Sequence, residues 1–264
     1  MKGPNLLSIL AVCLIMILGS CVTRGKMTYL QYSGTSAHDD LRIEDNRISV
    51  TPSEYKILPY DNLYIRVITP DPQWSVLFNT MPVGAGGAVT EESAGLFGYS
   101  VDTEGQIEIP FVGKVEVGGK TLSEIKMSLD TLFLQYLTDA AITIRLVNNY
   151  VSVIGEVRMP GRYILTKDRV TIFEAIAMAG DIENFGNRQR IQLIRPSPYG
   201  PVVKEFSLAD RSILSSEFYY VMPNDVIYTM PMNGRAFQVN SSFWSLFLST
   251  LTSALGVIAF FRTL

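Results

Sequence analysis

The chain of 264 residues carries 22 Lys and Arg against 25 Asp and Glu, which leaves a formal net charge of −3. This length suits one large or two small domains behind any targeting segment. Because the net charge is small and no basic patch stands out, nucleic acid is not expected as a partner. The single histidine, His38, offers little material for a Ser-His-Asp triad or a histidine metal site, so no metal or cofactor is expected.

The N-terminus has the layout of a secretory signal peptide over residues 1–20. Lys2 supplies a positive charge, and Leu6–Leu18 is an almost wholly apolar run. Leu-Gly-Ser and then Cys21 follow, and small residues suit the cleavage site of such a signal. This ending resembles the bacterial lipobox, which implies that Cys21 carries acyl chains. The alternatives are an uncleaved membrane anchor or a simple signal with a chance cysteine.

The cysteine count agrees with lipid attachment. Cys13 lies inside the apolar run and would leave with the signal, so the mature chain would keep Cys21 alone, already alkylated. A disulfide within one subunit, a cysteine metal cluster and a cysteine nucleophile are then excluded. Residues 21–53 are polar with mixed charges, which predicts a tether between the lipid and the first domain.

A first domain is expected over residues 54–149. A turn around Asp61 leads into an alternating strand at 63–68, and Asp71-Pro72 opens a short helix through Phe78. Segments 99–101 and 106–109 flank the turn at 102–105, which predicts a hairpin with Gly105 at positive φ. Pro110 and Gly113 are expected to interrupt that ladder.

The same domain continues with a clearly delimited helix. Thr121-Leu122-Ser123-Glu124 is a capping box, in which the threonine and glutamate side chains satisfy free N–H groups at the helix start. An apolar face follows at helical spacing, formed by Leu122, Ile125, Leu129, Leu132, Phe133 and Tyr136. A strand at 141–147 closes the domain.

A second domain is expected over residues 150–232. Strands at 151–155 and 162–165 flank a turn at Pro160-Gly161. A second capping box, Thr171 to Glu174, starts a helix that ends before Gly180. Later strands are predicted at 190–195, 202–207 and 226–230. The predicted class is α+β with two small mixed domains, the second close to a β-grasp.

A transmembrane helix is predicted within residues 240–262. No charged residue occurs between positions 243 and 261, and about 19 helical residues reach roughly 28 Å, close to the ~30 Å hydrocarbon core. Aromatic residues mark both ends, as at membrane–water boundaries: Phe243, Trp244, Phe260 and Phe261. The alternative is an apolar helix packed on the protein's own surface.

Small and polar residues of that helix form one narrow stripe at 100° per residue: Ser241, Ser245, Ser249, Thr252 and Gly256. A lone span in lipid has no use for such a stripe. Several copies would use it to line a water-filled pore or to pack helices closely. Both alternatives stay open.

Two groups of residues resemble the outer-membrane polysaccharide export lipoproteins that serve capsule and exopolysaccharide. In the first domain the resemblance is carried by the turn at Asp61 into Leu63-Tyr64-Ile65, by 101–110 with Gly113, and by 117–121. The second domain is similar to the soluble-ligand-binding β-grasp (SLBB) domain through 153–157, Pro160-Gly161, 171–180 and 223–228. The resemblance covers about residues 55–231 and accounts for both domains.

The resemblance implies a ring-shaped homo-oligomer, anchored in the outer membrane by lipid, with its soluble domains in the periplasm. Its C-terminal helices would cross that membrane as an α-helical barrel, and polysaccharide would pass through the lumen. An inner-membrane polysaccharide co-polymerase, often coupled to a tyrosine kinase, would deliver the polymer. One clear ligand-binding domain implies a shorter periplasmic stack than in longer members.

Catalysis is not expected. Glu91 and Glu92 suit a surface loop, whereas a glycosidase needs two carboxylates at a defined separation. Asp61, Asp102 and Asp225 lie in predicted turns, where their side chains are expected to bond backbone N–H groups. The alternative function is a glycan-binding or scaffolding lipoprotein without a pore.

Overall fold

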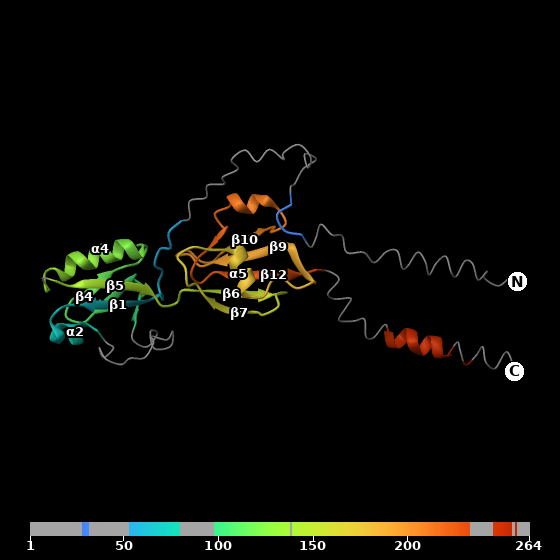
Figure 1. Cartoon of the computed structure of the whole chain (residues 1–264), viewed down its shortest axis with the longest axis horizontal. Coiled ribbons are helices and arrows are strands. Elements are labelled where there is room, and N and C mark those ends of the chain that lie inside the picture. Colours follow the sequence, from blue (N-terminus) through green and yellow to red (C-terminus); the bar gives the residue numbers. More distant parts are fainter. Residues whose placement is uncertain are drawn as a thin grey trace.

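The computed structural model describes residues 28–31, 53–79, 98–137, 139–232, 245–254 and 257. Two separate hydrophobic cores organise them, one formed by residues between Ile57 and Leu146 and the other mainly by residues between Val151 and Ile227. Figure 1 shows the two units end to end, with α4 over one sheet and α5 in the other unit. The predicted mixed α+β class is confirmed.

The first unit is a three-stranded sheet, a separate hairpin and two helices. Its elements are β1 (Asn62–Ile68), α2 (Pro72–Phe78), β2 (Tyr99–Ser100), β3 (Gln106–Ile109), β4 (Gly113–Glu116), α4 (Leu122–Phe133) and β5 (Ala141–Leu146). The sheet has the order β2-β1-β5, and both pairings are antiparallel. The strand at 63–68 and the helix opened by Asp71-Pro72 are confirmed.

Alternation along β1 decides which face of the sheet is buried. Leu63, Ile65 and Val67 are buried, while the residues between them face outward. Helix α4 covers the buried face with Ile125, Leu129 and Phe133, which recur at helical spacing. Burying one such side chain contributes about 1.5–3 kcal/mol, so this layer stabilises the unit.

Both predicted capping boxes are present. The Thr121 N–H donates to Glu124 at 2.8 Å and the Glu124 N–H donates to Thr121 Oγ1 at 3.2 Å. The Thr171 and Glu174 pair repeats this at 2.9 and 3.1 Å. The backbone N–H of each threonine holds the pKa of its glutamate below the usual range. Each box therefore fixes a helix start through groups three residues apart.

The turn predicted at residues 102–105 forms, since Gly105 N donates to Asp102 O at 3.1 Å and Asp102 N donates to Gln106 O at 2.9 Å, but the predicted pairing of its two flanking strands is wrong. Gly105 has φ +79° as predicted, but β2 pairs with β1, while β3 pairs with β4 through a turn at 110–112. Pro110 and Gly113, expected to interrupt a ladder, instead delimit the turn of the real hairpin, in which Phe111 has φ +66°. Gly105 is needed because its backbone approaches Gly118, where an added Cβ would lie 3.1 Å from the Gly118 Cα.

The second unit is a five-stranded mixed sheet with a short helix and a small second sheet. Its elements are β6 (Tyr150–Gly155), β7 (Gly161–Ile164), β8 (Val170–Thr171), α5 (Ile172–Met178), β9 (Gly186–Arg195), β10 (Val202–Phe206), the 3₁₀ helix η2 (Arg211–Ser215), β11 (Tyr220–Val221) and β12 (Val226–Pro231). The sheet order is β10-β9-β12-β6-β7, and β8 pairs with β11. Strands β6 and β12 are parallel, and the other pairings are antiparallel.

One predicted turn and one predicted helix end of this unit are confirmed. The turn at Pro160-Gly161 joins β6 to β7, which pair antiparallel. Gly180 follows the end of α5 with φ +75°, as expected of a C′ glycine. Buried residues of α5, Ile172, Ala175 and Ile176, join the core that contains the inward residues of β6 and β9.

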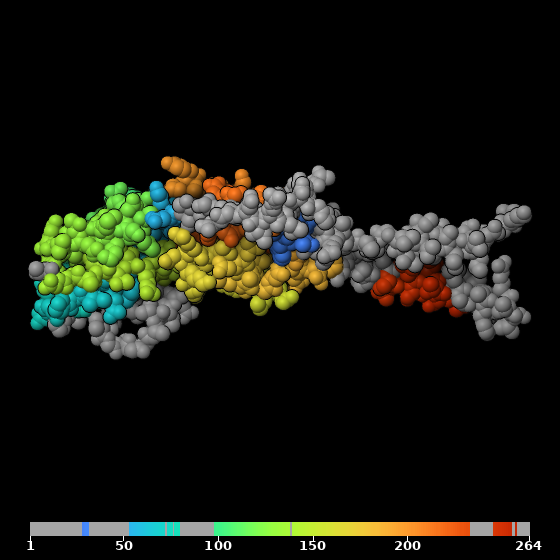
Figure 2. Space-filling model, turned by 45° about the horizontal axis from the view of Figure 1, so that its top comes forward, coloured from blue at the N-terminus to red at the C-terminus, as the bar shows by residue number. Residues whose placement is uncertain are grey.

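A short N-terminal segment, residues 28–31, packs on the second unit. Leu30 and Gln31 donate backbone hydrogen bonds to Leu208 O at 3.0 Å and Ala209 O at 2.5 Å. The Tyr29 hydroxyl donates to Asp181, and the Arg188 guanidinium lies 5.1 Å from the Tyr29 ring centroid. Figure 2 shows this segment in blue against the second unit. The prediction of a tether over 21–53 did not anticipate this docking.

Replacing Tyr29 by phenylalanine is expected to remove one late step from the alkaline absorbance titration of the tyrosines. Burial, followed by the hydrogen bond to Asp181, raises the pKa of Tyr29 to about 12. Because this value lies above the ordinary pKa of about 10, the protonated Tyr29 hydroxyl contributes its full stabilisation of the folded protein below pH ~10. This stabilisation is lost as pH rises through ~12. A difference spectrum between wild type and Tyr29→Phe with its midpoint near 10 would contradict the docking.

Candidate functional site

The C-terminal helix contains three of the predicted stripe residues. Residues 245–254 are helical, and Ser245, Ser249 and Thr252 are all exposed on them. Large apolar side chains of the same segment are also more than 45% exposed: Leu246, Phe247, Leu248, Leu251 and Val257. A contiguous exposed apolar surface of this kind marks an interaction with a membrane or with other protein.

Hydroxyl groups on this helix bond back to its own backbone. Thr252 Oγ1 donates to Leu248 O at 2.9 Å, and Ser253 Oγ donates to Ser249 O at 2.8 Å. Thr250 Oγ1 likewise donates to Phe247 O at 2.8 Å. Side chains that bond to the preceding turn have their donors satisfied without water. These hydroxyls are therefore compatible with an apolar surrounding as well as with a wet one.

Within the residues that the structure describes, no helix is both long enough and apolar enough to span a membrane. The remaining predicted residues of this segment lie outside the described part: Ser241, Phe243, Trp244, Gly256, Phe260 and Phe261. The predicted span over 240–262 therefore stays a prediction. Cys21, His38, Glu91 and Glu92 also lie outside the described residues.

A polar cluster around one buried aspartate joins the first unit to the second. Asp61 is 3% exposed, and its Oδ2 accepts from Leu58 N at 2.8 Å and from the Tyr55 hydroxyl at 2.9 Å. Its Oδ1 accepts from Asn148 Nδ2 at 2.7 Å and from Asn224 Nδ2 at 3.3 Å. We call Asp61, Tyr55, Asn148 and Asn224 the junction cluster.

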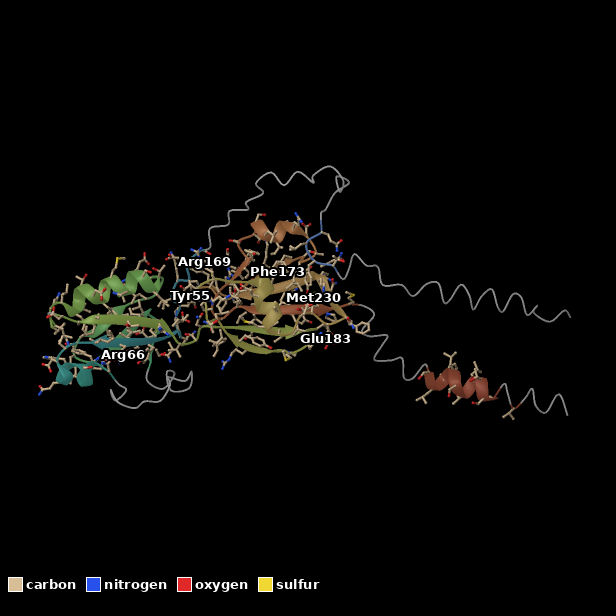
Figure 3. All side chains as sticks on the ribbon, viewed as in Figure 1. Tyr55, Arg66, Arg169, Phe173, Glu183 and Met230 are labelled. Atoms are coloured by element: carbon tan, nitrogen blue, oxygen red, sulfur yellow. The ribbon has the colours of Figure 1, made fainter. Side chains whose placement is uncertain are left out.

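The junction cluster connects residues far apart in the sequence. Asn224 belongs to the turn before β12, and its Nδ2 also lies 3.5 Å from the Tyr55 hydroxyl. Burial, followed by the charge and hydrogen bond of Asp61, raises the pKa of Tyr55 above its usual range. Figure 3 labels Tyr55 at the boundary between the two units. Tyr55 therefore stays protonated, so its hydroxyl donates to Asp61 within the first unit and accepts from Asn224 across the boundary.

The same turn holds a buried ion pair. Arg195 on β9 donates to Asp225 from Nε at 3.0 Å and from Nη2 at 2.8 Å. Asp225 also accepts from Met222 N at 2.7 Å, and Arg195 donates to Tyr220 O at 3.0 Å. Burial raises the pKa of the Asp225 carboxyl, and the Arg195 hydrogen bonds oppose that rise.

The predicted role of the turn aspartates is confirmed and extended. Asp61, Asp102 and Asp225 each accept backbone N–H bonds within their turns. The pairing of Asp225 with Arg195 and that of Asp61 with Asn224 were missed. The sequence signal for these contacts is the polar turn Asn224-Asp225 directly before an alternating strand.

Among the described residues, no group of three or more His, Cys, Asp or Glu side chains is arranged to hold a metal ion. The polar groups that converge at the junction cluster bond one another and backbone groups, and this arrangement serves position rather than reaction.

Comparison with known proteins identifies the first unit. Residues 49–147 match the family model described as polysaccharide biosynthesis/export protein. The EPS I polysaccharide export outer membrane protein EpsA of Ralstonia nicotianae is 33% identical over 102 residues, which are 37% of this chain and 27% of that protein. Its Ralstonia solanacearum counterpart is 30% identical over 102 residues, with the same coverage.

A third similar protein extends the match. The exopolysaccharide production protein ExoF of Rhizobium meliloti is 30% identical over 143 residues, which are 52% of this chain and 30% of that protein. The matched stretch thus spans less than a third of each of these curated relatives. Residues 49–147, with the strands, α4 and Asp61 described above, thus match the polysaccharide biosynthesis/export protein family.

Proposed function

We propose that this chain exports a capsular or extracellular polysaccharide from the periplasm to the cell surface as an oligomeric outer-membrane channel. The observation that carries the proposal is the family match over residues 49–147. The names of the two Ralstonia relatives, which are polysaccharide export outer membrane proteins, support the same process and place. The protein would act by conducting polymer, without catalysing a reaction.

The soluble units would stand in the periplasm below the channel. The second unit is proposed to be an SLBB-type β-grasp, since its mixed sheet wraps around α5 and its parallel β6–β12 pair lies inside the sheet. The junction cluster would hold the two units in a fixed relation within each subunit. An inner-membrane polysaccharide co-polymerase or tyrosine kinase is the proposed partner on the periplasmic side.

Two attachments to the outer membrane are proposed, acyl chains on Cys21 and a C-terminal helix within residues 240–262. Leu and Phe side chains exposed on residues 245–254 supply an apolar surface for lipid. Ser245, Ser249 and Thr252 would line the lumen or pack neighbouring helices, and the back-bonded Thr252 hydroxyl suits both arrangements. Weak and repeated contacts with sugar are what conduction requires.

Deletion of residues 241–264 tests the channel. Surface polysaccharide is expected to be lost, because a channel without its membrane segment cannot release polymer. Both units should remain folded, because the buried residues of their cores all lie between Ile57 and Ile227. Surface polymer is measured on intact cells, and folding is measured by circular dichroism of the purified protein.

Two controls make this experiment decisive. A strain lacking the whole protein sets the level of export without it, and full-length protein expressed to the same level sets the upper limit. If the deletion variant still exports near the upper limit, the chain is a glycan-binding scaffold rather than a channel. If the strain lacking the protein also exports normally, the export function itself is wrong.

A further inference from the structure

One face of the first unit's sheet is open to solvent in the described part of the chain. Helix α4 covers the other face, and Figure 3 places Arg66 on the side away from α4. Because strand residues alternate, Tyr64 and Arg66 of β1 point to the same face as Thr143 and Arg145 of β5. We call these four residues the open face.

The strand register places the open face in one small square. Tyr64 lies directly opposite Arg145, and Arg66 lies directly opposite Thr143. Opposed residues of an antiparallel pair are about 4.5–5.5 Å apart at Cβ, and diagonal neighbours about 7–8 Å. The two guanidinium groups therefore occupy diagonal corners, and one tyrosine ring and one hydroxyl occupy the others.

The charge of this face is opposite to that of the whole chain. Arg66 and Arg145 are exposed, and neither guanidinium group has an ion pair or hydrogen bond among the described residues. Neighbouring positions on the same face are neutral, namely Asn62, Ile68, Ser100 and Ala141. The chain as a whole has a formal net charge of −3. Two cations at diagonal positions of one face, without a described partner, thus create a local site for an anion.

The residue types narrow down the anion. A guanidinium group pairs with carboxylate or phosphate through two parallel hydrogen bonds. The ring of Tyr64, which is partly exposed, offers a flat apolar surface beside a polar tip. A sugar ring with an acidic substituent presents the matching features, an apolar C–H face and an anionic group. A simple phosphate ion would leave the aromatic corner unused.

We propose that the open face binds acidic sugar units of the exported polymer, with Arg66 and Arg145 pairing carboxylates and Tyr64 stacking on the sugar ring. This inference rests on the proposed export function and assigns the substrate class, an anionic polysaccharide. Exposed charge pairs are individually weak and screened by salt. The face would therefore guide polymer along the subunit without retaining it.

Binding by the full-length protein in mild detergent tests the proposal. The probes are fluorescently labelled oligogalacturonate and a neutral dextran oligomer of similar length, followed by anisotropy. The double variant Arg66→Ala/Arg145→Ala is expected to lose at least tenfold in affinity for oligogalacturonate. The weaker binding of the dextran oligomer is expected to stay unchanged, and higher salt should lower the affinity of the wild type for oligogalacturonate.

The matched control is Arg158→Ala/Arg169→Ala, which removes the same charge from two exposed arginines of the second unit. Its affinity for oligogalacturonate is expected to stay within twofold of wild type. Thermal unfolding of both double variants verifies their fold, since all four side chains are exposed.

Three results would overturn the proposal: an unchanged affinity in the Arg66→Ala/Arg145→Ala protein, equal loss in the control variant, or equal binding of acidic and neutral oligomers. Phosphatidylglycerol vesicles are a further probe, which tests for lipid binding. If they bind more tightly than oligogalacturonate and lose binding in the same variant, the face is a lipid site. These outcomes concern purified protein, so they are separate from failure of export in cells, which addresses the proposed function.

Discussion

Replacing Arg195 by alanine is expected to lower the free energy of unfolding by about 3–5 kcal/mol, the usual cost of breaking a buried ion pair from one side. Asp225 has a fully buried side chain, and Arg195 keeps 15% of its side chain exposed. Without the guanidinium, Asp225 would retain the Met222 N–H as its one remaining donor among the hydrogen bonds described above. Urea unfolding followed by circular dichroism measures the loss.

The pH dependence of this variant has a defined sign. Burial already raises the pKa of Asp225, and removal of Arg195 takes away the group that opposes this rise. A carboxyl with a raised pKa binds its proton in the folded state before the unfolded state does, so stability increases as pH falls through the folded pKa. The difference between Arg195→Ala and wild type is therefore expected to shrink on acidification from neutral pH.

Arg190→Ala is the matched control, since Arg190 lies on the same strand and pairs with Glu205 at 2.8 Å. Both side chains of that pair are well exposed, and exposed pairs contribute little to stability. The control is expected to be much closer to wild type than Arg195→Ala. Equal losses of stability in the two variants would show that burial does not determine how much the Arg195–Asp225 pair contributes to the free energy of unfolding.

Local features of the fold could be predicted because their partners lie a few residues apart. The capping boxes at Thr121 and Thr171 use a side chain three positions ahead, and Gly180 is required by the helix end directly before it. The mixed α+β class follows from the same short-range signals. These features depend on backbone groups that any helix end or turn exposes.

Pairing between distant segments could not be read from the same signals. The turn at 102–105 has the composition of a hairpin turn, yet β2 pairs with β1 and β3 pairs with β4, an arrangement in which Ile107 and Ile109 are buried. Arg195 is 30 residues from Asp225, and Tyr55 is 169 residues from Asn224. Spacing in the sequence carries no information on such contacts.

The docking of residues 28–31 was missed for a related reason. This stretch has too few apolar residues for a periodic pattern, and its position depends on Arg188 and Asp181 of the second unit. For an exporter with acyl chains on Cys21, as proposed, the docking would shorten the path between lipid and the second unit. Membrane attachment and soluble fold would then be linked at Tyr29.

The junction cluster provides the second large prediction. Asp61→Ala is expected to lower the free energy of unfolding of the first unit by about 3–5 kcal/mol, because unsatisfied buried donors cost about 1–3 kcal/mol each. Four donors lose their acceptor: Leu58 N, the Tyr55 hydroxyl, Asn148 Nδ2 and Asn224 Nδ2. Because the amides of the two asparagines can in part bond water instead, the expected loss of stability is smaller than the sum of the four separate costs.

Trp74 provides the readout, since it belongs to the first unit and stacks on Phe78 with ring centroids 5.9 Å apart. Its fluorescence should report earlier urea unfolding in Asp61→Ala, while amide exchange in β12 reports on the second unit. Asp102→Ala is the control, because Asp102 accepts two N–H bonds in a less buried turn, and a lost turn or cap bond costs about 1 kcal/mol.

The same experiment tests whether the junction cluster couples the two units. Across the boundary, the Asn224 side chain donates to Asp61 and to the Tyr55 hydroxyl. Loss of Asp61 should therefore also speed amide exchange in the turn at 222–225. Asp102→Ala should leave that turn unchanged. If exchange at 222–225 is the same in wild type and Asp61→Ala, the units are held together by other contacts, and the junction cluster stabilises the first unit alone.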